Sequence, residues 1–191
     1  MSFWYDKDNR CTYEEWVERA GGLLKSLDLF LRMNKIDTVL EFGTGNSTRV
    51  LAKRCKKVIT VDSNEYSIIV PVDEQKSFDR NFWGELKKED NVEFICGDIT
   101  KIEFRMFKQY NPELIIIDPG STEEDKYLYR VLYDRLKANG VLSHDPLLFI
   151  DNVSFCKLFM DHLSKIEGYM ISIFDTDQAI ARKALNDLEP M

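Results

Sequence analysis

The feature of this sequence that most constrains its fold is an alternation of short apolar runs with stretches of helical periodicity. The runs that we expect to form strands are 38–42, 58–61, 92–96, 114–117 and 141–143. Apolar residues recur at helical spacing between or after them, as in 47–55 and 156–166. Strands that alternate with helices predict a parallel sheet with helices on both faces. Two last runs, 169–174 and 178–184, are close enough to form a hairpin, which adds one antiparallel strand.

The segment before this alternation is expected to be a helical extension, 1–36, of a core at 37–184, both within one domain that spans 1–191. Thr12 and Glu15 have the spacing of a capping box, in which each side chain satisfies the backbone N–H group of the other residue. A chain of 191 residues can bury about 70% of the surface that its unfolded form exposes. Folding therefore requires neither disulfides nor metals.

Composition and charge restrict the partners of the chain. It carries 26 basic and 33 acidic side chains, a formal net charge of −7, so it repels phosphate backbones unless its basic residues gather on one face. The densest basic cluster, 53–57, precedes an expected strand, and we therefore expect no nucleic-acid partner. No apolar run reaches the roughly 20 residues of a membrane helix, and the acidic N-terminus is unlike a signal peptide.

The four cysteines are far apart and form no Cys-x-x-Cys pair. They are therefore expected to be free thiols rather than zinc ligands, which favours a reduced protein of the cytoplasm. No membrane partner is expected. The sequence leaves the oligomeric state open, a homodimer included.

Acidic residues stand at the ends of the expected strands, where doubly wound sheets bind their ligands. They are Glu41, Asp62, Asp98, Asp118 and Asp145, and His144 lies beside the last of them. The turn at 43–45, Gly-Thr-Gly, lets a ligand approach the backbone at a helix N-terminus. Asp62 lies 19 residues after Gly43, where a carboxylate can accept hydrogen bonds from a ribose diol. The pattern predicts a site for an adenosine-containing cofactor, although each part alone also fits a helix cap or a turn.

Five segments follow one another in an order that is typical of a known family. They are 39–48, 58–62, 94–99, 114–118 and 136–142. Over 37–184 the chain resembles the class I S-adenosylmethionine-dependent methyltransferases. The resemblance implies a Rossmann-like, doubly wound sheet of seven strands, mostly parallel with one antiparallel strand, and S-adenosylmethionine as the cofactor. The residues to which it assigns cofactor binding are Glu41, Gly43, Thr44, Gly45, Ser47, Asp62, Ser63, Asp98, Ile99 and Asp118.

Two other nucleotide-binding classes fit the sequence less well. The fingerprint of dinucleotide-binding dehydrogenases needs a third glycine at the position of Thr48. The chain also has no room for a second, substrate-binding domain. No Gly-Lys-Ser/Thr motif is present, which excludes a Walker-type phosphate loop. The chain differs from the typical methyltransferase motif at Ser47, where the family often has a third glycine.

The resemblance also implies transfer of a methyl group, to an oxygen or a nitrogen of a small-molecule acceptor. A hydroxyl or amine that accepts a methyl group loses a proton, so a base is expected near the ends of the fourth and fifth strands. By position, the candidate catalytic residues are Asp118, His144 and Asp145. His144 also fits a structural role, as a cap of the loop that follows it.

Metal dependence is a separate question. Catechol-type O-methyltransferases resemble this chain in the acid that follows the fourth strand, and they hold a divalent ion with that acid and an Asp-Asn pair after the fifth strand. Asp118 and Asp145 match this pattern, but Pro146 takes the asparagine position and offers no side-chain ligand. A Mg²⁺ site would be one ligand short, so we predict no metal ligands and do not favour a metal cofactor.

Two further functions fit the same motifs. A methyltransferase that acts on protein or RNA would need a basic or grooved face. A catalytically silent module that binds S-adenosylmethionine would keep the same cofactor residues, because these support binding and not turnover. The aromatic residues at 3–5 and in the long crossover 63–91 are candidates for a cover over the pocket, although a plain packed helix fits the crossover as well.

Overall fold

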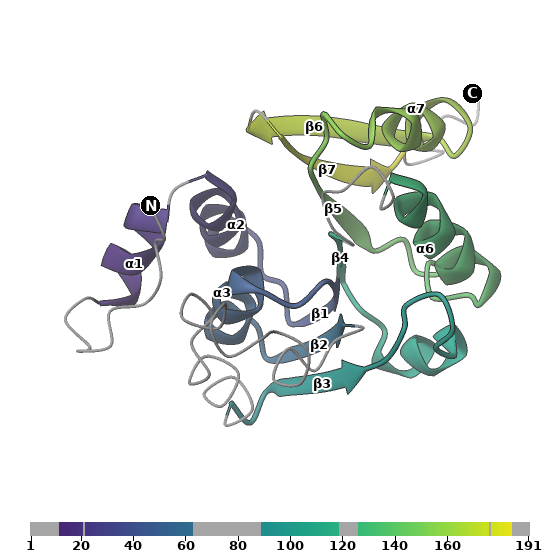
Figure 1. Cartoon of the computed structure of the whole chain (residues 1–191). Helices are drawn as coiled ribbons and strands as arrows, with labels where there is room; N and C mark the ends of the chain where they lie inside the picture. The colour runs from purple at the N-terminus through teal and green to yellow at the C-terminus, as the bar shows by residue number, and fades with distance from the viewer. Residues whose placement is uncertain (1–11, 21, 63–88, 119–125, 176, 185–191) are drawn as a thin grey trace, which may run out of the picture. The chain divides into compact units, whose positions relative to one another are not determined.

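Figure 1 shows the chain as a computed structural model, which describes residues 12–20, 22–62, 89–118, 126–175 and 177–184. The contacts divide the chain into two compact units, Met1–Ile102 and Glu103–Met191, so the boundary falls inside the expected core at 37–184. Among the described residues, seven strands follow one another in the order β3-β2-β1-β4-β5-β7-β6. The sheet is mostly parallel with an antiparallel C-terminal part, which confirms the predicted fold class.

The sheet of the first unit contains three parallel strands, which lie side by side in Figure 1. They are β1 (Thr38–Phe42), β2 (Lys57–Asp62) and β3 (Val92–Cys96). All three agree with the predicted runs, and β2 extends one residue further at each end. Asp62 is therefore the last residue of β2, and it pairs in register with Cys96 at the end of β3. The carboxyl ends of these strands meet at one edge.

Three helices complete the described part of the first unit: α1 (Tyr13–Ala20), α2 (Gly22–Met33) and α3 (Asn46–Arg54). The predicted capping box opens α1, since Thr12 N donates to Glu15 Oε2 at 2.7 Å and Glu15 N donates to Thr12 Oγ1 at 3.2 Å. The helical extension before β1 is not one continuous helix, because α1 ends at Ala20 and a second helix, α2, follows it. α2 begins at Gly22, whose φ of +41° suits glycine.

The second unit joins two parallel strands to an antiparallel hairpin. β4 pairs parallel with β5, β7 pairs antiparallel with β5, and β6 pairs antiparallel with β7. The hairpin is the one that the sequence predicts. The elements of this unit are η1 (Phe104–Tyr110), β4 (Leu114–Ile117), α6 (Lys126–Ala138), β5 (Leu147–Asp151), α7 (Lys157–Lys165), β6 (Tyr169–Asp175) and β7 (Gln178–Lys183).

The prediction of the fifth strand is wrong. The residues at 141–143 form turns, in which Ser143 N donates to the Gly140 carbonyl and Asp145 N to the Leu142 carbonyl. The strand begins later, at Leu147, because the apolar run at 147–150 pairs with β4 on one side and with β7 on the other. Val141 and Leu142 are buried, so their apolar character reflects burial in a turn rather than a strand.

Some predictions lie outside the described residues. These are the cofactor role of Ser63, the aromatic residues at 3–5, and the crossover as far as residue 88. Within the described residues, Cys55, Cys96 and Cys156 are free thiols, as the cysteine spacing predicts. No helix in the part of the chain that the structure describes is long and apolar enough to cross a bilayer.

Candidate functional site

The turn that follows β1 rests on the carboxylate of Glu41, which is fully buried at 0% exposure. Its Oε1 accepts a hydrogen bond from Ser47 Oγ at 2.6 Å. Its Oε2 accepts bonds from Thr48 Oγ1 at 2.6 Å and from Thr60 Oγ1 at 2.8 Å. A buried carboxylate is tolerated when donors satisfy its oxygens, and here the donors come from α3 and β2. Glu41 therefore fixes the position of the turn relative to both elements.

Glycine is favoured at positions 43 and 45 of this turn for different physical reasons. Gly43 has a φ of +96°, which a residue with a Cβ rarely adopts. Gly45 has a φ of −167°, which is extended backbone open to any residue. A Cβ added at Gly45 would meet no atom within 4 Å, so packing against the described residues does not require glycine there. No described residue therefore crowds the backbone of Gly45 at the N-terminus of α3, a position at which a ligand can approach closely.

Asp62 lies beside the same turn. Thr44 N donates to Asp62 Oδ2 at 3.0 Å, and the hydroxyls of Thr44 and Thr60 are 2.8 Å apart. The Asp62 side chain is half-buried at the end of β2. The structure therefore brings the carboxylate predicted for a ribose diol to the edge of the glycine turn, as the sequence spacing indicates.

Asp98 takes part in a turn of its own after β3. Its carboxylate accepts bonds from Thr100 N at 2.8 Å and Thr100 Oγ1 at 2.6 Å, and pairs with Lys101 Nζ at 2.7 Å. These partners, Lys101 first, hold the pKa of Asp98 well below its usual range. A Cβ at Gly97 would lie 2.6 Å from Ile102 Cγ2, so the turn needs glycine there. Ile99 lies in the same turn. Both Asp98 and Ile99 thus follow β3 at the edge where β1 and β2 also end.

In the second unit the structure brings together three polar side chains, two of which the sequence analysis missed. Asn152 Nδ2 donates to Asp118 Oδ1 at 3.2 Å and lies 3.3 Å from Asp151 Oδ2. Asp118 directly follows β4, and Asp151 is the last residue of β5. Asn152 has a φ of +56°, in the left-handed region that asparagine tolerates better than most residues. The cluster formed by Asp118, Asp151 and Asn152 is called the carboxylate cluster below.

The surroundings of the carboxylate cluster are largely buried. Burial raises the pKa of Asp151, against hydrogen bonds from Asn152 N and the Gln178 side chain, which act to lower it. Tyr129 Oη donates to the Asp151 carbonyl at 3.2 Å, and burial followed by the charge of Asp118 raises the pKa of this phenol. Burial also raises the pKa of the Cys156 thiol to about 12, so this thiol is no nucleophile at neutral pH.

His144 and Asp145 do not join the carboxylate cluster. Both precede β5, whereas Asp151 ends it, so they lie at the opposite end of that strand. The His144 ring nitrogen Nε2 is 2.6 Å from the Pro112 carbonyl oxygen, a structural contact with the segment before β4 rather than the predicted cap of the following loop. The sequence placed these two residues at a carboxyl end because it placed the strand six residues too early. That placement is corrected here.

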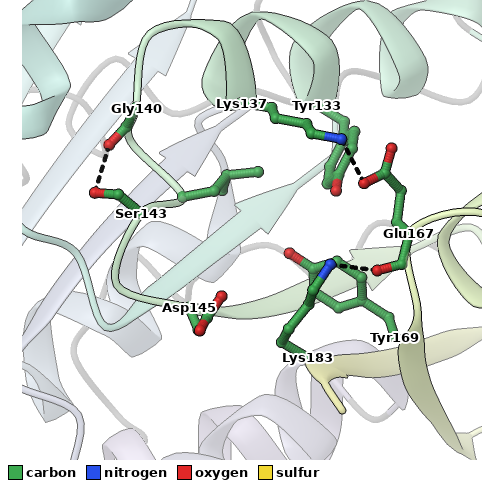
Figure 2. Close-up of a pocket in the computed structure, with 9 residues that line it drawn as sticks. Tyr133, Lys137, Gly140, Ser143, Asp145, Glu167, Tyr169 and Lys183 are labelled. Atoms are coloured by element: carbon green, nitrogen blue, oxygen red, sulfur yellow. Dashed lines mark hydrogen bonds and ion pairs between the residues drawn. The ribbon is translucent and has the colours of Figure 1, made fainter. Parts of the chain in front are cut away.

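Asp145 instead borders a cavity of about 220 Å³ (Figure 2). The Glu167 carboxylate on the far side pairs with Lys137 Nζ at 2.6 Å, and its backbone carbonyl accepts a bond from Lys183 Nζ. The acidic and basic groups of this wall therefore satisfy one another. The cavity lies at the amino ends of β5 and β6, away from the carboxylate cluster.

No group of three or more His, Cys, Asp or Glu side chains among the described residues has the arrangement of a metal site. The carboxylate cluster contains only two such side chains, Asp118 and Asp151, and its third member is an amide. Carboxylate and amide oxygens are both ligands for hard divalent cations. In the structure, however, Asn152 turns Nδ2 towards both carboxylates, so its amide would have to rotate by 180° to offer the oxygen to a cation between them.

No family model matches the chain. Over 88 residues it is 35% identical to a curated protein of Methanosarcina acetivorans named "Probable ribosomal RNA small subunit methyltransferase A". The match covers 45% of this chain and 29% of that protein, so the chain spans less than a third of the length of this relative.

Solved structures resemble the chain over most of its length. The N-methyltransferase NodS from Bradyrhizobium japonicum, in complex with S-adenosylhomocysteine, matches with a TM-score of 0.52 at 14% identity, over 90% of this chain and 92% of NodS. The O-methyltransferase NovP matches with a TM-score of 0.52 at 13% identity, over 84% and 79% of the two chains. Together with the strand order, these likenesses define the class: the chain has the fold of the class I S-adenosylmethionine-dependent methyltransferases.

Proposed function

We propose that the chain is an S-adenosylmethionine-dependent methyltransferase that acts on an oxygen of a small-molecule acceptor. The observation that carries this proposal is the open glycine turn beside Asp62. A glycine that packing against the described residues does not require, at a helix N-terminus and next to a carboxylate, is suited to a ligand that carries a ribose. The binding of S-adenosylhomocysteine by NodS, which has the same fold, supports the choice of cofactor.

In this proposal the first unit holds the cofactor. Asp62 accepts the ribose hydroxyls, and Asp98 and Ile99 contact the adenine; the cofactor role of Ser63 stays a prediction from the sequence. The backbone at 43–45 faces the rest of the cofactor. Glu41 and Ser47 act indirectly, because the Glu41 carboxylate is enclosed by hydroxyl donors and fixes the turn.

The second unit takes the acceptor at the carboxylate cluster. Methyl transfer from a sulfonium is an in-line displacement in which the acceptor oxygen forms the new bond, the sulfur–methyl bond breaks, and the acceptor hydroxyl loses its proton. Asp118 and Asp151 are the candidate groups for positioning that hydroxyl and receiving its proton. This assignment replaces His144 and Asp145, which lie at the other end of β5.

The corrected strand also changes the metal question. The fifth strand ends at Asp151 and Asn152 follows it, so these two residues, rather than Asp145 and Pro146, are the counterpart that we propose for the Asp-Asn pair of the catechol-type enzymes. We therefore propose that Asp118, Asp151 and Asn152 can hold a divalent cation such as Mg²⁺. When bound, such a cation supplies positive charge that favours the deprotonated acceptor oxygen.

RNA methylation is a second candidate, favoured by the 35% identity to the rRNA methyltransferase-named protein of Methanosarcina acetivorans. The formal net charge of −7 stands against it, because RNA binding needs a concentrated basic face. The two candidates share the cofactor site and differ only in the acceptor.

The first test measures S-adenosylhomocysteine binding to the wild type and to Asp62→Ala by calorimetry. Loss of a charged hydrogen-bond acceptor weakens binding by about 10-fold or more. Asp161→Ala is the control, since Asp161 pairs only with Lys165 on the exposed face of α7. Absence of binding in the wild type, or equal affinity in Asp62→Ala, would disprove the cofactor site.

The second test follows formation of S-adenosylhomocysteine with a panel of hydroxylated small molecules and with a ribosomal RNA transcript, each in Mg²⁺ and in EDTA. Turnover of a hydroxylated small molecule that stops in EDTA supports the proposal. Turnover of the RNA alone supports the second candidate. Binding of the cofactor without turnover of any acceptor would identify a silent binding module instead.

A further inference from the structure

Gln178 is a buried polar residue next to the carboxylate cluster that no motif of the sequence singles out. It is the first residue of β7, pairs in register with Asp151 of β5, and is 4% exposed. Its side chain gives a hydrogen bond to the Asp151 carboxylate. Its Oε1, in contrast, is buried and has no hydrogen-bond partner among the described residues.

A buried acceptor without a donor costs about 1–3 kcal/mol, so its presence in a folded protein requires a reason. Rotating the amide by 180° would not solve the problem. It would turn Oε1 towards the Asp151 carboxylate, and two acceptors would then face each other. The bond to Asp151 therefore fixes the orientation of the amide and leaves Oε1 as the unsatisfied atom.

The start of β7 is held firmly to the loop after the carboxylate cluster. Val153 N donates to the Asp177 carbonyl at 3.0 Å, and Ser154 N donates to Asp177 Oδ1 at 2.7 Å. These bonds join the residue before Gln178 to the two residues after Asn152. These bonds and the β5–β7 pairing connect Gln178 to the segment that carries Asp151 and Asn152, as expected of a residue that supports a binding site.

We infer that Gln178 is a positioning residue for the cation of the carboxylate cluster: its amide N–H orients Asp151, and its Oε1 accepts a hydrogen bond from a water molecule that accompanies the cation. The inference rests on the cation site proposed above. Mg²⁺ and Mn²⁺ keep several waters when proteins bind them, and each water brings hydrogen-bond donors. Such a donor satisfies the buried Gln178 Oε1, which has no hydrogen-bond partner among the described residues.

The test uses the full chain and Mn²⁺ as the probe, with affinity measured by electron paramagnetic resonance and calorimetry. Gln178→Met, of similar volume and without polar donors, should weaken Mn²⁺ binding about 10- to 100-fold, the range for loss of an outer partner of a ligand. Gln109→Leu, at an exposed position of η1, should leave the affinity unchanged. Gln178→Met removes an unsatisfied buried acceptor but also the N–H that bonds Asp151, so its unfolding temperature is measured to show that the variant is folded under the binding conditions.

The outcomes separate this inference from the proposed cation site. No Mn²⁺ binding by the wild type would overturn the cation site and the inference with it. Binding that Asn152→Gly abolishes and Gln178→Met leaves intact would overturn the inference alone. If Gln178→Met does not fold, Mg²⁺ titration of the wild type by NMR decides: the side-chain amide signals of Gln178 should shift while those of Gln109 do not, and unshifted Gln178 signals would overturn the inference.

Discussion

The two units each place carboxylates at the ends of parallel strands, but they supply them with donors very differently. In the first unit Glu41 receives three hydroxyl groups at 2.6–2.8 Å, and no oxygen of it lacks a partner. In the second unit Asn152 Nδ2 donates to both Asp118 and Asp151 over longer distances, 3.2 and 3.3 Å, and Asp151 also accepts bonds from Asn152 N and the Gln178 side chain. Three short hydroxyl bonds to a fully buried carboxylate suit Glu41 to a structural role, whereas longer bonds to carboxylates at a strand end suit Asp118 and Asp151 to a ligand that brings positive charge.

The largest effect is expected at Glu41. Replacing it by leucine removes the acceptor of three buried hydroxyl groups, and each unsatisfied group costs about 1 kcal/mol or more. Glu41→Leu should therefore lower the free energy of unfolding by about 3 kcal/mol, measured by urea denaturation. Glu41→Gln keeps the shape and one acceptor oxygen, and should lose less than half as much. A change below 1 kcal/mol in Glu41→Leu would contradict the structural role.

Asn152 tests the opposite property in the second unit. Asn152→Gly keeps the backbone conformation at φ +56°, which glycine adopts readily, and removes the amide between the two carboxylates. We expect methyl transfer to fall about 100-fold, while S-adenosylhomocysteine affinity changes less than about twofold and stability by less than about 1 kcal/mol. Steady-state kinetics, calorimetry and urea denaturation of the same preparation measure these three quantities. Parallel losses of stability and activity would contradict a functional role for the cluster.

The difference between the two units also explains what the sequence could predict. The proposed cofactor site of the first unit is encoded locally: the strand at 38–42, its glycine turn and Asp62 lie within 25 residues, and all three occur where the pattern indicates. The hydrogen-bond donors of Glu41 are harder to predict from the sequence, because Thr60 lies next to Glu41 only through the register of β1 and β2. That register is not visible in a residue pattern.

The sequence did not predict Asp151 and Asn152 as site residues because two neighbouring apolar runs, 141–142 and 147–150, both resemble the fifth strand. Val141 and Leu142 follow a helix-ending glycine and suit a strand, but they are buried in turns. The run at 147–150 is longer, begins after Pro146 and ends in Asp151, so the rule of an apolar run followed by an acid would have found it. Gln178 could not be found in this way, since its pairing with Asp151 depends on the antiparallel ladder between β5 and β7.

Glu167 tests whether the hydrogen-bond donors around a carboxylate, rather than the unit in which it lies, determine whether it has a structural role. It lies in the second unit, yet it resembles Glu41 in being well supplied. Lys137 Nζ lies 2.6 Å from Oε2, His162 Nε2 lies 3.2 Å from Oε1, and Tyr133 adds a further hydrogen bond. The bond from Lys137 acts first to lower the pKa of Glu167, burial opposes it, and the balance holds the pKa below the ordinary value of 4.5.

The smallest effect is expected when Lys137 is replaced by methionine. A carboxyl whose folded pKa is lowered stabilises the protein above its unfolded pKa, and loses that contribution as the pH falls through the folded value. At pH 7 Lys137→Met should therefore be less stable than the wild type by no more than about 1 kcal/mol, because Lys137 is largely exposed. The difference between the two proteins should shrink as the pH falls below 4.5, measured by urea denaturation at several pH values. A stability difference that persists at acidic pH would assign the role of Lys137 to packing of its aliphatic stem. The comparison of Glu167 with Glu41 as carboxylates stabilised by their donors would then fail.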